Sequence, residues 1–110
     1  MVIISDVSFP QESANDVGKR FLELPPVPEF MTYIGPFVKG KKDGIHAIEI
    51  YELDKSKVGE GVEFVSNRFV KYFGIPGYLY EVNTYLEATK ALLEISKHRS
   101  LPALISQAWR

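Results

Sequence analysis

The spacing of the apolar residues changes repeatedly along this chain, and that change limits the fold more than any other feature. Residues 2–9 are short, apolar and rich in β-branched side chains, which predicts a strand that ends at Pro10. From Ser13 the apolar residues recur every three or four positions, which predicts an amphipathic helix. They are Ala14, Val17, Phe21 and Leu24. The prolines of residues 25–28 end this helix, because proline has no amide hydrogen to donate.

Two further strands follow, and a hairpin joins them. Residues 29–39 return to strand chemistry, but Gly35-Pro36 interrupts them, so we expect an edge strand or a bulge there. The turn at residues 40–44 contains an Asp-Gly pair, which is a strong hairpin signal. Residues 45–53 form the clearest strand, whose side chains alternate between two faces. One face carries His46, Ile48, Ile50 and Glu52, and the other carries Ala47, Glu49 and Tyr51.

The chain continues with a second helix, a fourth strand and further helical segments. The apolar residues of this helix again recur every three or four positions, at Val58, Val62, Val65, Phe69 and Tyr72. The Gly-Ile-Pro-Gly sequence at residues 74–77 ends the helix, and residues 78–86 are predicted to form a strand. A short helix is expected over residues 87–97, and another helical segment after Ser100.

This order of elements predicts an α+β fold. Each crossover must return its strand to the same sheet by a right-handed connection, so the leading topology is a ferredoxin-like βαββαβ arrangement. In that arrangement two helices cover one face of a four-stranded antiparallel sheet. We assign residues 1–97 to a single ferredoxin-like domain and residues 98–110 to a C-terminal helical tail.

The composition excludes several classes of function. The chain has no cysteine, which excludes disulfides, thiolate metal sites and cysteine nucleophiles. Lys and Arg number 13 against 14 Asp and Glu, a balance that argues against binding to nucleic acid. No apolar run is long enough to cross a bilayer, and no basic segment precedes Asp6, so we expect neither membrane association nor a signal peptide. A cytoplasmic protein is therefore expected.

Metal, cofactor and phosphate sites have little support in the sequence. The two histidines, His46 and His98, have no paired spacing, so we expect no metal site and no cofactor. Residues 35–42 approximate a phosphate-binding loop, but Lys42 stands where Ser or Thr would hold magnesium. The segment also leads into a strand rather than a helix. We interpret it as a lysine-rich hairpin tip.

A sheet with helices on one face leaves the other face open, and both faces of this sheet carry apolar residues. Ile48 and Ile50 lie on one face of the central strand, and Tyr51 lies on the other. Because an exposed apolar sheet marks an interface, and most small oligomers have two-fold symmetry, we expect a homodimer through the sheet face. Four aromatic residues that the helix–sheet core does not need are assigned to an intersubunit core. They are Tyr33, Tyr51, Tyr85 and Trp109.

Three segments of the chain carry a resemblance to a known superfamily. They are residues 1–10, the hairpin at residues 40–44 with the following strand at residues 48–52, and residues 80–88. Together they resemble the dimeric α+β-barrel superfamily, and within it a group of small uncharacterised proteins. The resemblance covers about residues 1–97 and implies ferredoxin-like subunits that pack sheet against sheet around a central barrel. It transfers no catalytic residue, because the superfamily hosts many activities.

The tail at residues 98–110 also fits an assembly. Ser100 can cap a helix, and Pro102 is tolerated in its first turn. The apolar residues that follow need a cover. They are Leu101, Leu104, Ile105 and Trp109. We expect the tail to pack on the dimer, either across the partner or over the mouth of the barrel; the alternative is a frayed terminus.

Glu49 is the most informative candidate for a functional site, because a carboxylate in an apolar strand is costly to bury without partners. On a barrel face it could meet Ser5 or Asp6, Tyr33 and Tyr51; otherwise it pairs with a basic residue or points to solvent. His46 could act as an acid, a base or a haem ligand, or simply bond to backbone at the strand end. We predict a cavity between the sheet and its partner, lined by Tyr33, His46, Glu49, Tyr51 and Glu81.

Three functions fit such a cavity. The favoured hypothesis is binding of a small hydrophobic molecule with one polar head, such as an aromatic or fatty carboxylate. The enzymatic alternative is a cofactor-independent monooxygenase, or a small lyase or isomerase, with His46 or Glu49 as general base. The third hypothesis is a structural dimer module that binds no ligand, because its own side chains fill the barrel.

Overall fold

The computed structural model describes residues 1–88. The helix predicted over residues 87–97 extends beyond that range, and the tail at residues 98–110 lies wholly outside it. Within residues 1–88 the chain forms an α+β fold with a four-stranded antiparallel sheet and two α-helices. This confirms the predicted class and is consistent with a ferredoxin-like fold.

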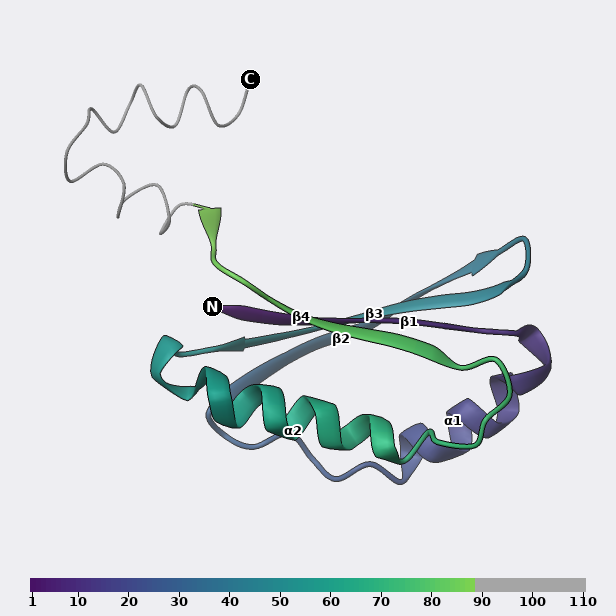
Figure 1. The fold of residues 1–110 in the computed structure, drawn as a ribbon, viewed down its shortest axis with the longest axis horizontal. Helices are drawn as coiled ribbons and strands as arrows, with labels where there is room; N and C mark the ends of the chain where they lie inside the picture. The colour runs from purple at the N-terminus through teal and green to yellow at the C-terminus, as the bar shows by residue number, and fades with distance from the viewer. Residues whose placement is uncertain (89–110) are drawn as a thin grey trace, which may run out of the picture.

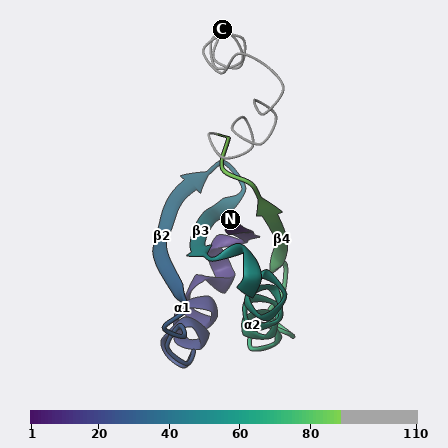
Figure 2. The same ribbon diagram turned by 90° about the vertical axis from the view of Figure 1, so that its left-hand side faces the viewer.

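The elements follow the predicted order. The strands are β1 (Val2–Phe9), β2 (Met31–Lys41), β3 (Gly44–Leu53) and β4 (Leu79–Tyr85). The helices are α1 (Ala14–Leu22) and α2 (Val58–Val70), each preceded by a short 3-10 turn, at Gln11–Ser13 and Lys55–Lys57. The sheet order is β2-β3-β1-β4, and each neighbouring pair is antiparallel. Both helices lie on one side of the sheet, as Figures 1 and 2 show, and the other side is referred to below as the open face.

The ends of α1 and β2 differ from the predicted ends by two residues. α1 ends at Leu22 rather than Leu24, because the residue before Pro25 is disfavoured in the helical region. β2 begins at Met31, whose amide donates to the carbonyl of Pro28 and closes a turn. β2 also extends to Lys41, which pairs with Gly44, so the hairpin turn is tighter than predicted.

The interruption of β2 at Gly35-Pro36 is a bulge, as the sequence predicts, and β2 is an edge strand. The pairing passes from Ile34 with Ile50 to Phe37 with Ile48, so β2 carries one residue more than β3 here. Because side chains alternate along a strand, the extra residue moves each side chain after the bulge to the opposite face of the sheet. It places Phe37 on the open face and turns Val38 toward the helices.

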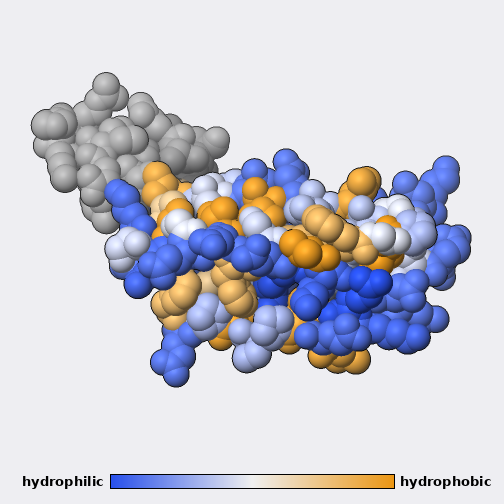
Figure 3. Space-filling model, turned by 60° about the horizontal axis from the view of Figure 1, so that its bottom comes forward, coloured by the Kyte–Doolittle hydropathy of each residue, from blue (hydrophilic) through white to orange (hydrophobic). Residues whose placement is uncertain are grey.

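The core lies between the sheet and the helices. Ile3, Tyr51 and Leu53 of the sheet pack with Val65 and Phe69 of α2. Aromatic rings extend this core toward β4: Phe69 stacks on Tyr80 with centroids 4.3 Å apart, and Tyr72 stacks on Tyr78 at 4.7 Å. The outer side of the helical layer, which Figure 3 mainly shows, mixes hydrophilic with apolar residues.

The assignment of Tyr33 and Tyr51 to an intersubunit core is wrong. Tyr51 has no exposed surface and belongs to the helix–sheet core, and Tyr33 packs against it with ring centroids 5.2 Å apart. Strand β3 has apolar residues on both faces, so alternation alone cannot decide which face the helices cover. Tyr85 does lie on the open face, opposite Val2. Trp109 lies outside the described residues.

Gly61 has a packing role that explains its place in a helix. A Cβ atom at this position would lie 2.4 Å from Leu53 Cδ1 and 3.0 Å from Ile3 Cδ1. The absence of a side chain therefore lets α2 approach the centre of the sheet closely. A helical glycine costs about 1 kcal/mol relative to alanine, and at this position that cost is offset by close packing against Leu53 and Ile3.

Candidate ligand-binding pocket

Glu49 lies near the middle of β3 with only 8% of its surface exposed, and three hydroxyl groups donate to its carboxylate. Tyr33 donates to Oε2 at 2.5 Å, and Tyr51 donates to the same oxygen at 3.3 Å. Ser5 donates to Oε1 at 3.4 Å. Strands β1, β2 and β3 each contribute a donor, and these hydrogen bonds replace the water that the carboxylate loses on burial.

The strand register explains this arrangement. Ser5 lies directly opposite Glu49 across β1 and β3, and Tyr33 lies opposite Tyr51 across β2 and β3. Residues 49 and 51 share a face of β3, so the four side chains converge on the helix side of the sheet. Ser5, Tyr33 and Tyr51 are among the partners that the sequence allows for Glu49 on a barrel face, but they meet it on the helix side of the sheet. Asp6, the remaining predicted partner, lies on the opposite face.

Arg68 of α2 brings a buried positive charge to the same region, and sequence reasoning missed it. Its side chain is 7% exposed, and Nη1 donates to the carbonyl of Pro25 at 3.1 Å. The guanidinium lies 5.8 Å from the ring centroid of Tyr33 and 5.6 Å from that of Phe64. A signal was available, since Arg68 follows Val65 by three positions and so borders the apolar stripe of the helix.

The phenols around Glu49 are held in their neutral, donating form. Burial raises the pKa of Tyr33 and of Tyr51, and the negative charge of Glu49 raises both further. Arg68 acts in the opposite direction on both tyrosines. Ionised phenols beside a carboxylate would repel it, so neutral phenols are the form that stabilises the site.

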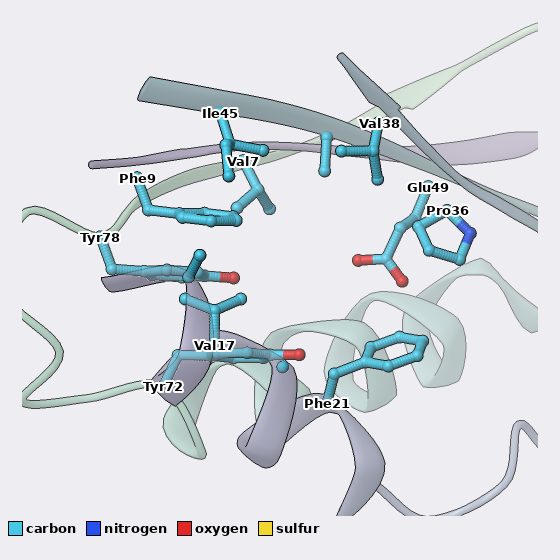
Figure 4. A pocket seen from close by; sticks show the side chains of 13 residues that line it. Val7, Phe9, Val17, Phe21, Pro36, Val38, Ile45, Glu49, Tyr72 and Tyr78 are labelled. Carbon is cyan, nitrogen blue, oxygen red and sulfur yellow. The ribbon is translucent and has the colours of Figure 1, made fainter. Parts of the chain in front are cut away.

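A pocket of about 280 Å³ lies between the sheet and α1, and Glu49 reaches into it. Its walls are mainly apolar. They include Val7 and Phe9 of β1, Val17 and Phe21 of α1, and Ile45 and Ala47 of β3. Figure 4 shows the labelled apolar side chains around a common space, with the carboxylate of Glu49 directed into it. Pro36 of the bulge and Val38, which lies beyond it, also line the pocket.

Two further hydroxyl groups belong to this pocket. Tyr72 and Tyr78 also line the pocket. Figure 4 shows that both hydroxyl groups point into it, toward the side on which Glu49 lies. Within residues 1–88 neither hydroxyl has a hydrogen-bond partner. Burial raises the pKa of Tyr72 to about 12, and the charge of Glu49 adds to that shift. The pKa of Tyr78 is also raised, first by burial and then by Tyr72 and Glu49.

The sheet separates the five residues predicted to line one cavity. Tyr33, Glu49 and Tyr51 meet on the helix side. His46 and Glu81 lie on the open face, because His46 pairs with Ser8 and Glu81 with Asp6 in the register. These two residues therefore cannot line the pocket around Glu49. His46 instead contacts a carboxylate, with Nε2 2.5 Å from Asp6 Oδ1.

Metal-binding clusters, phosphate-binding loops and membrane-spanning helices are not found among the described residues. Residues 1–88 contain no group of three His, Asp or Glu side chains that could hold a metal ion. Residues 35–41 form the second half of β2, so this segment does not join a strand to a helix as a phosphate-binding loop does. In the same part of the chain, neither helix has the length and hydrophobicity to cross a bilayer.

Comparison with known proteins adds weak similarities. No family model matches the chain, and no curated protein sequence matches it. Similar solved structures include aminopeptidase PepT from Bacillus cereus, with 10% identity, 87% of this chain and 34% of that chain covered, and a TM-score of 0.47. A tripeptidase from Staphylococcus aureus matches with 14% identity and a TM-score of 0.44, and the match again covers 87% of this chain and 34% of that chain.

A third structure, a DUF3240 family protein from Shewanella baltica, has 12% identity and a TM-score of 0.29. Here 78% of this chain and 97% of that chain are covered. By contrast, this chain spans about a third of the length of the two peptidases. Similarities at this level transfer no property to this chain.

Proposed function

We propose that this protein binds a small, mainly apolar molecule in the pocket between the sheet and α1, and that it works as a homodimer of ferredoxin-like subunits. One observation carries the binding proposal. A buried carboxylate, Glu49, is the charged end of a pocket whose remaining walls are mainly apolar. Ligand sites commonly combine apolar walls with a few convergent polar groups in this way.

The pocket lies within one subunit, which changes the location expected from the sequence. It is built by β1, α1, β2 and β3 together with the aromatic residues Tyr72 and Tyr78. Its volume of about 280 Å³ is near the lower end for ligand sites, which favours a molecule with one ring and a short chain over a long fatty chain.

Gly18 offers a direct test of this site. It lines the pocket on α1, and a Cβ atom added there would meet nothing within 4 Å. The Gly18→Leu variant fills space at the wall and improves helix propensity by up to about 1 kcal/mol, so lost binding could not be ascribed to unfolding. Calorimetric titration with 3-phenylpropan-1-ol should show binding to the wild type and its loss in Gly18→Leu.

Gly59 provides the matched control. It also lies in a helix and also has open space where its Cβ atom would be, but it does not line the pocket. The Gly59→Leu variant should bind 3-phenylpropan-1-ol as the wild type does. Equal binding to both glycine variants would place the ligand elsewhere and refute the proposed site.

The open face of the sheet supports the dimer. Its apolar side chains form a continuous patch in the register, since Ile4 and Ile34 both pair with Ile50. Phe37 extends the patch beside Ile48 and is 55% exposed. No element within residues 1–88 covers this face. If two copies paired through this face, its apolar surface would be buried, and exposed apolar surface of this kind marks interfaces.

The oligomeric state tests the dimer separately. Sedimentation equilibrium should find a dimer for the wild type and a monomer for Ile50→Glu, because the new charge would be buried without a partner at the centre of the interface. Leu22→Glu, on an 84% exposed position of α1, is the control and should remain dimeric. A monomeric wild type would refute this part of the proposal.

A second candidate function follows from the same carboxylate. Of the two general bases considered from the sequence, Glu49 reaches the pocket and His46 does not. An enzyme acting on a bound small molecule would therefore use Glu49 to accept a proton. Turnover that disappears in Glu49→Gln, with ligand binding retained, would favour the enzyme over the binding protein.

A further inference from the structure

The hydrogen bonds of Glu49 are unevenly divided between its two oxygens. Oε2 accepts from Tyr33 at 2.5 Å and from Tyr51 at 3.3 Å, whereas Oε1 accepts only from Ser5, at 3.4 Å. An ionised carboxylate can accept about four hydrogen bonds. Oε1 therefore retains acceptor capacity, and the carboxylate is directed into the pocket (Figure 4).

The other polar atoms of the pocket can also accept hydrogen bonds. Tyr72 is only 5% exposed, yet its hydroxyl has no partner within residues 1–88 and points into the pocket. The hydroxyl of Tyr78 does the same. A neutral hydroxyl has two acceptor lone pairs, so three side chains present oxygen acceptors to the same space.

No cation among the described residues lines this pocket. Arg68, a buried positive charge beside the network, acts on Tyr33 and Tyr51 but does not line the pocket. A carboxylate head group would therefore meet the charge of Glu49 without a compensating partner. The aromatic or fatty carboxylate expected from the sequence does not suit a pocket of this polarity.

We infer that the ligand is a small organic amine with an apolar body, whose protonated nitrogen donates to Oε1 of Glu49 and to the hydroxyls of Tyr72 and Tyr78. An ammonium group has three donors and a positive charge, which matches one anionic and two neutral acceptors. The apolar body occupies the space between Val17 and Phe21 of α1 and the sheet. This inference rests on the proposed binding function and specifies the class of ligand.

Three probes of matched shape test the inference on the full chain at neutral pH: 3-phenylpropylamine, 3-phenylpropan-1-ol and 3-phenylpropionate. Calorimetric titration should give an affinity for the amine at least about tenfold above that for the alcohol, and no measurable binding of the carboxylate. Binding of the carboxylate as tight as that of the amine would overturn the inference and leave the binding function standing. Failure of all three probes to bind would overturn both.

Two variants assign the preference to particular atoms. Glu49→Gln keeps the size of the side chain and removes its charge, so the preference for the amine over the alcohol should vanish. Glu81→Gln, which removes a carboxylate from the open face, is the matched control and should keep the preference. If Glu49→Gln does not fold, Tyr72→Phe serves instead. This variant retains the ring and should lower the affinity for the amine several-fold. An unchanged preference in the folded variant would overturn the inference.

Discussion

The hydroxyl of Tyr33 donates a 2.5 Å hydrogen bond to Oε2 of Glu49, which joins the edge strand β2 to the buried carboxylate of β3. This contact connects stability with function, because the carboxylate that the tyrosine stabilises is also the charged group of the pocket. Glu49 would be costly to bury alone, and its hydroxyl partners make the pocket possible.

Removing that hydroxyl should destabilise the fold. Tyr33→Phe keeps the ring against Tyr51 and leaves the carboxylate without its shortest hydrogen bond. We expect a loss of about 2 kcal/mol in the free energy of unfolding, measured by urea denaturation. Ser66→Ala, which removes a hydroxyl group from an exposed position of α2, is the control and should change the free energy little. Equal effects of the two variants would contradict the account.

Arg68 and Glu49 should be energetically coupled. Glu49 raises the pKa of Tyr33 and of Tyr51, whereas Arg68 lowers both. Because the two opposite charges lie beside the same tyrosines, each is expected to stabilise the other. Arg68→Met should cost about 3 kcal/mol in the free energy of unfolding. In a Glu49→Gln background the same change should cost about 1 kcal/mol less, and a double-mutant cycle measures that difference. Strict additivity would show that the two charges act independently.

Gly44 should be intolerant of a side chain. Its φ of +151° lies where L residues are rare, and a Cβ atom would lie 2.4 Å from the carbonyl oxygen of Phe9. Gly44→Ala should lower the free energy of unfolding by more than about 1 kcal/mol. Gly40→Ala in the same hairpin, with nothing within 4 Å of the new atom, should have a small effect. A thermal melting comparison of the two variants checks this.

Stability should fall at alkaline pH. Burial and Glu49 raise the pKa of Tyr72 from 10.0 to about 12, so the folded state holds this proton more tightly than the unfolded state. The stabilisation is complete below pH 10 and is lost as the pH rises toward 12. Urea denaturation across that range should show the decline, and Tyr72→Phe should reduce its size. A decline that is identical in the variant would exclude Tyr72 as a contributor.

Local signals predicted the backbone well. The strand over residues 2–9 agrees with β1 in both bounds, and Gly35-Pro36 marks the bulge of the edge strand. These features depend on residues close together in the sequence. The ends of α1 and β2 shifted by two residues, because the proline-rich connection shortens the helix and forms a turn before Met31.

The faces of the sheet could not be predicted in the same way. The alternation in β3 shows that Glu49 and Tyr51 share a face and that His46 lies on the other, and the structure agrees. It does not show which face the helices cover, because both faces contain apolar residues. For that reason the sequence could name Ser5, Tyr33 and Tyr51 as possible partners of Glu49 but not its location inside the subunit.

The most direct test of the central claim is a heteronuclear NMR titration of the full chain with 3-phenylpropylamine. If the amine binds in the pocket, resonances of Val17, Ile45 and Ala47 will shift with added ligand. Those of Ile48 and Ile50 on the open face will shift little. Shifts confined to the open face, or none up to an amine concentration on the order of 10 mM, would contradict the account.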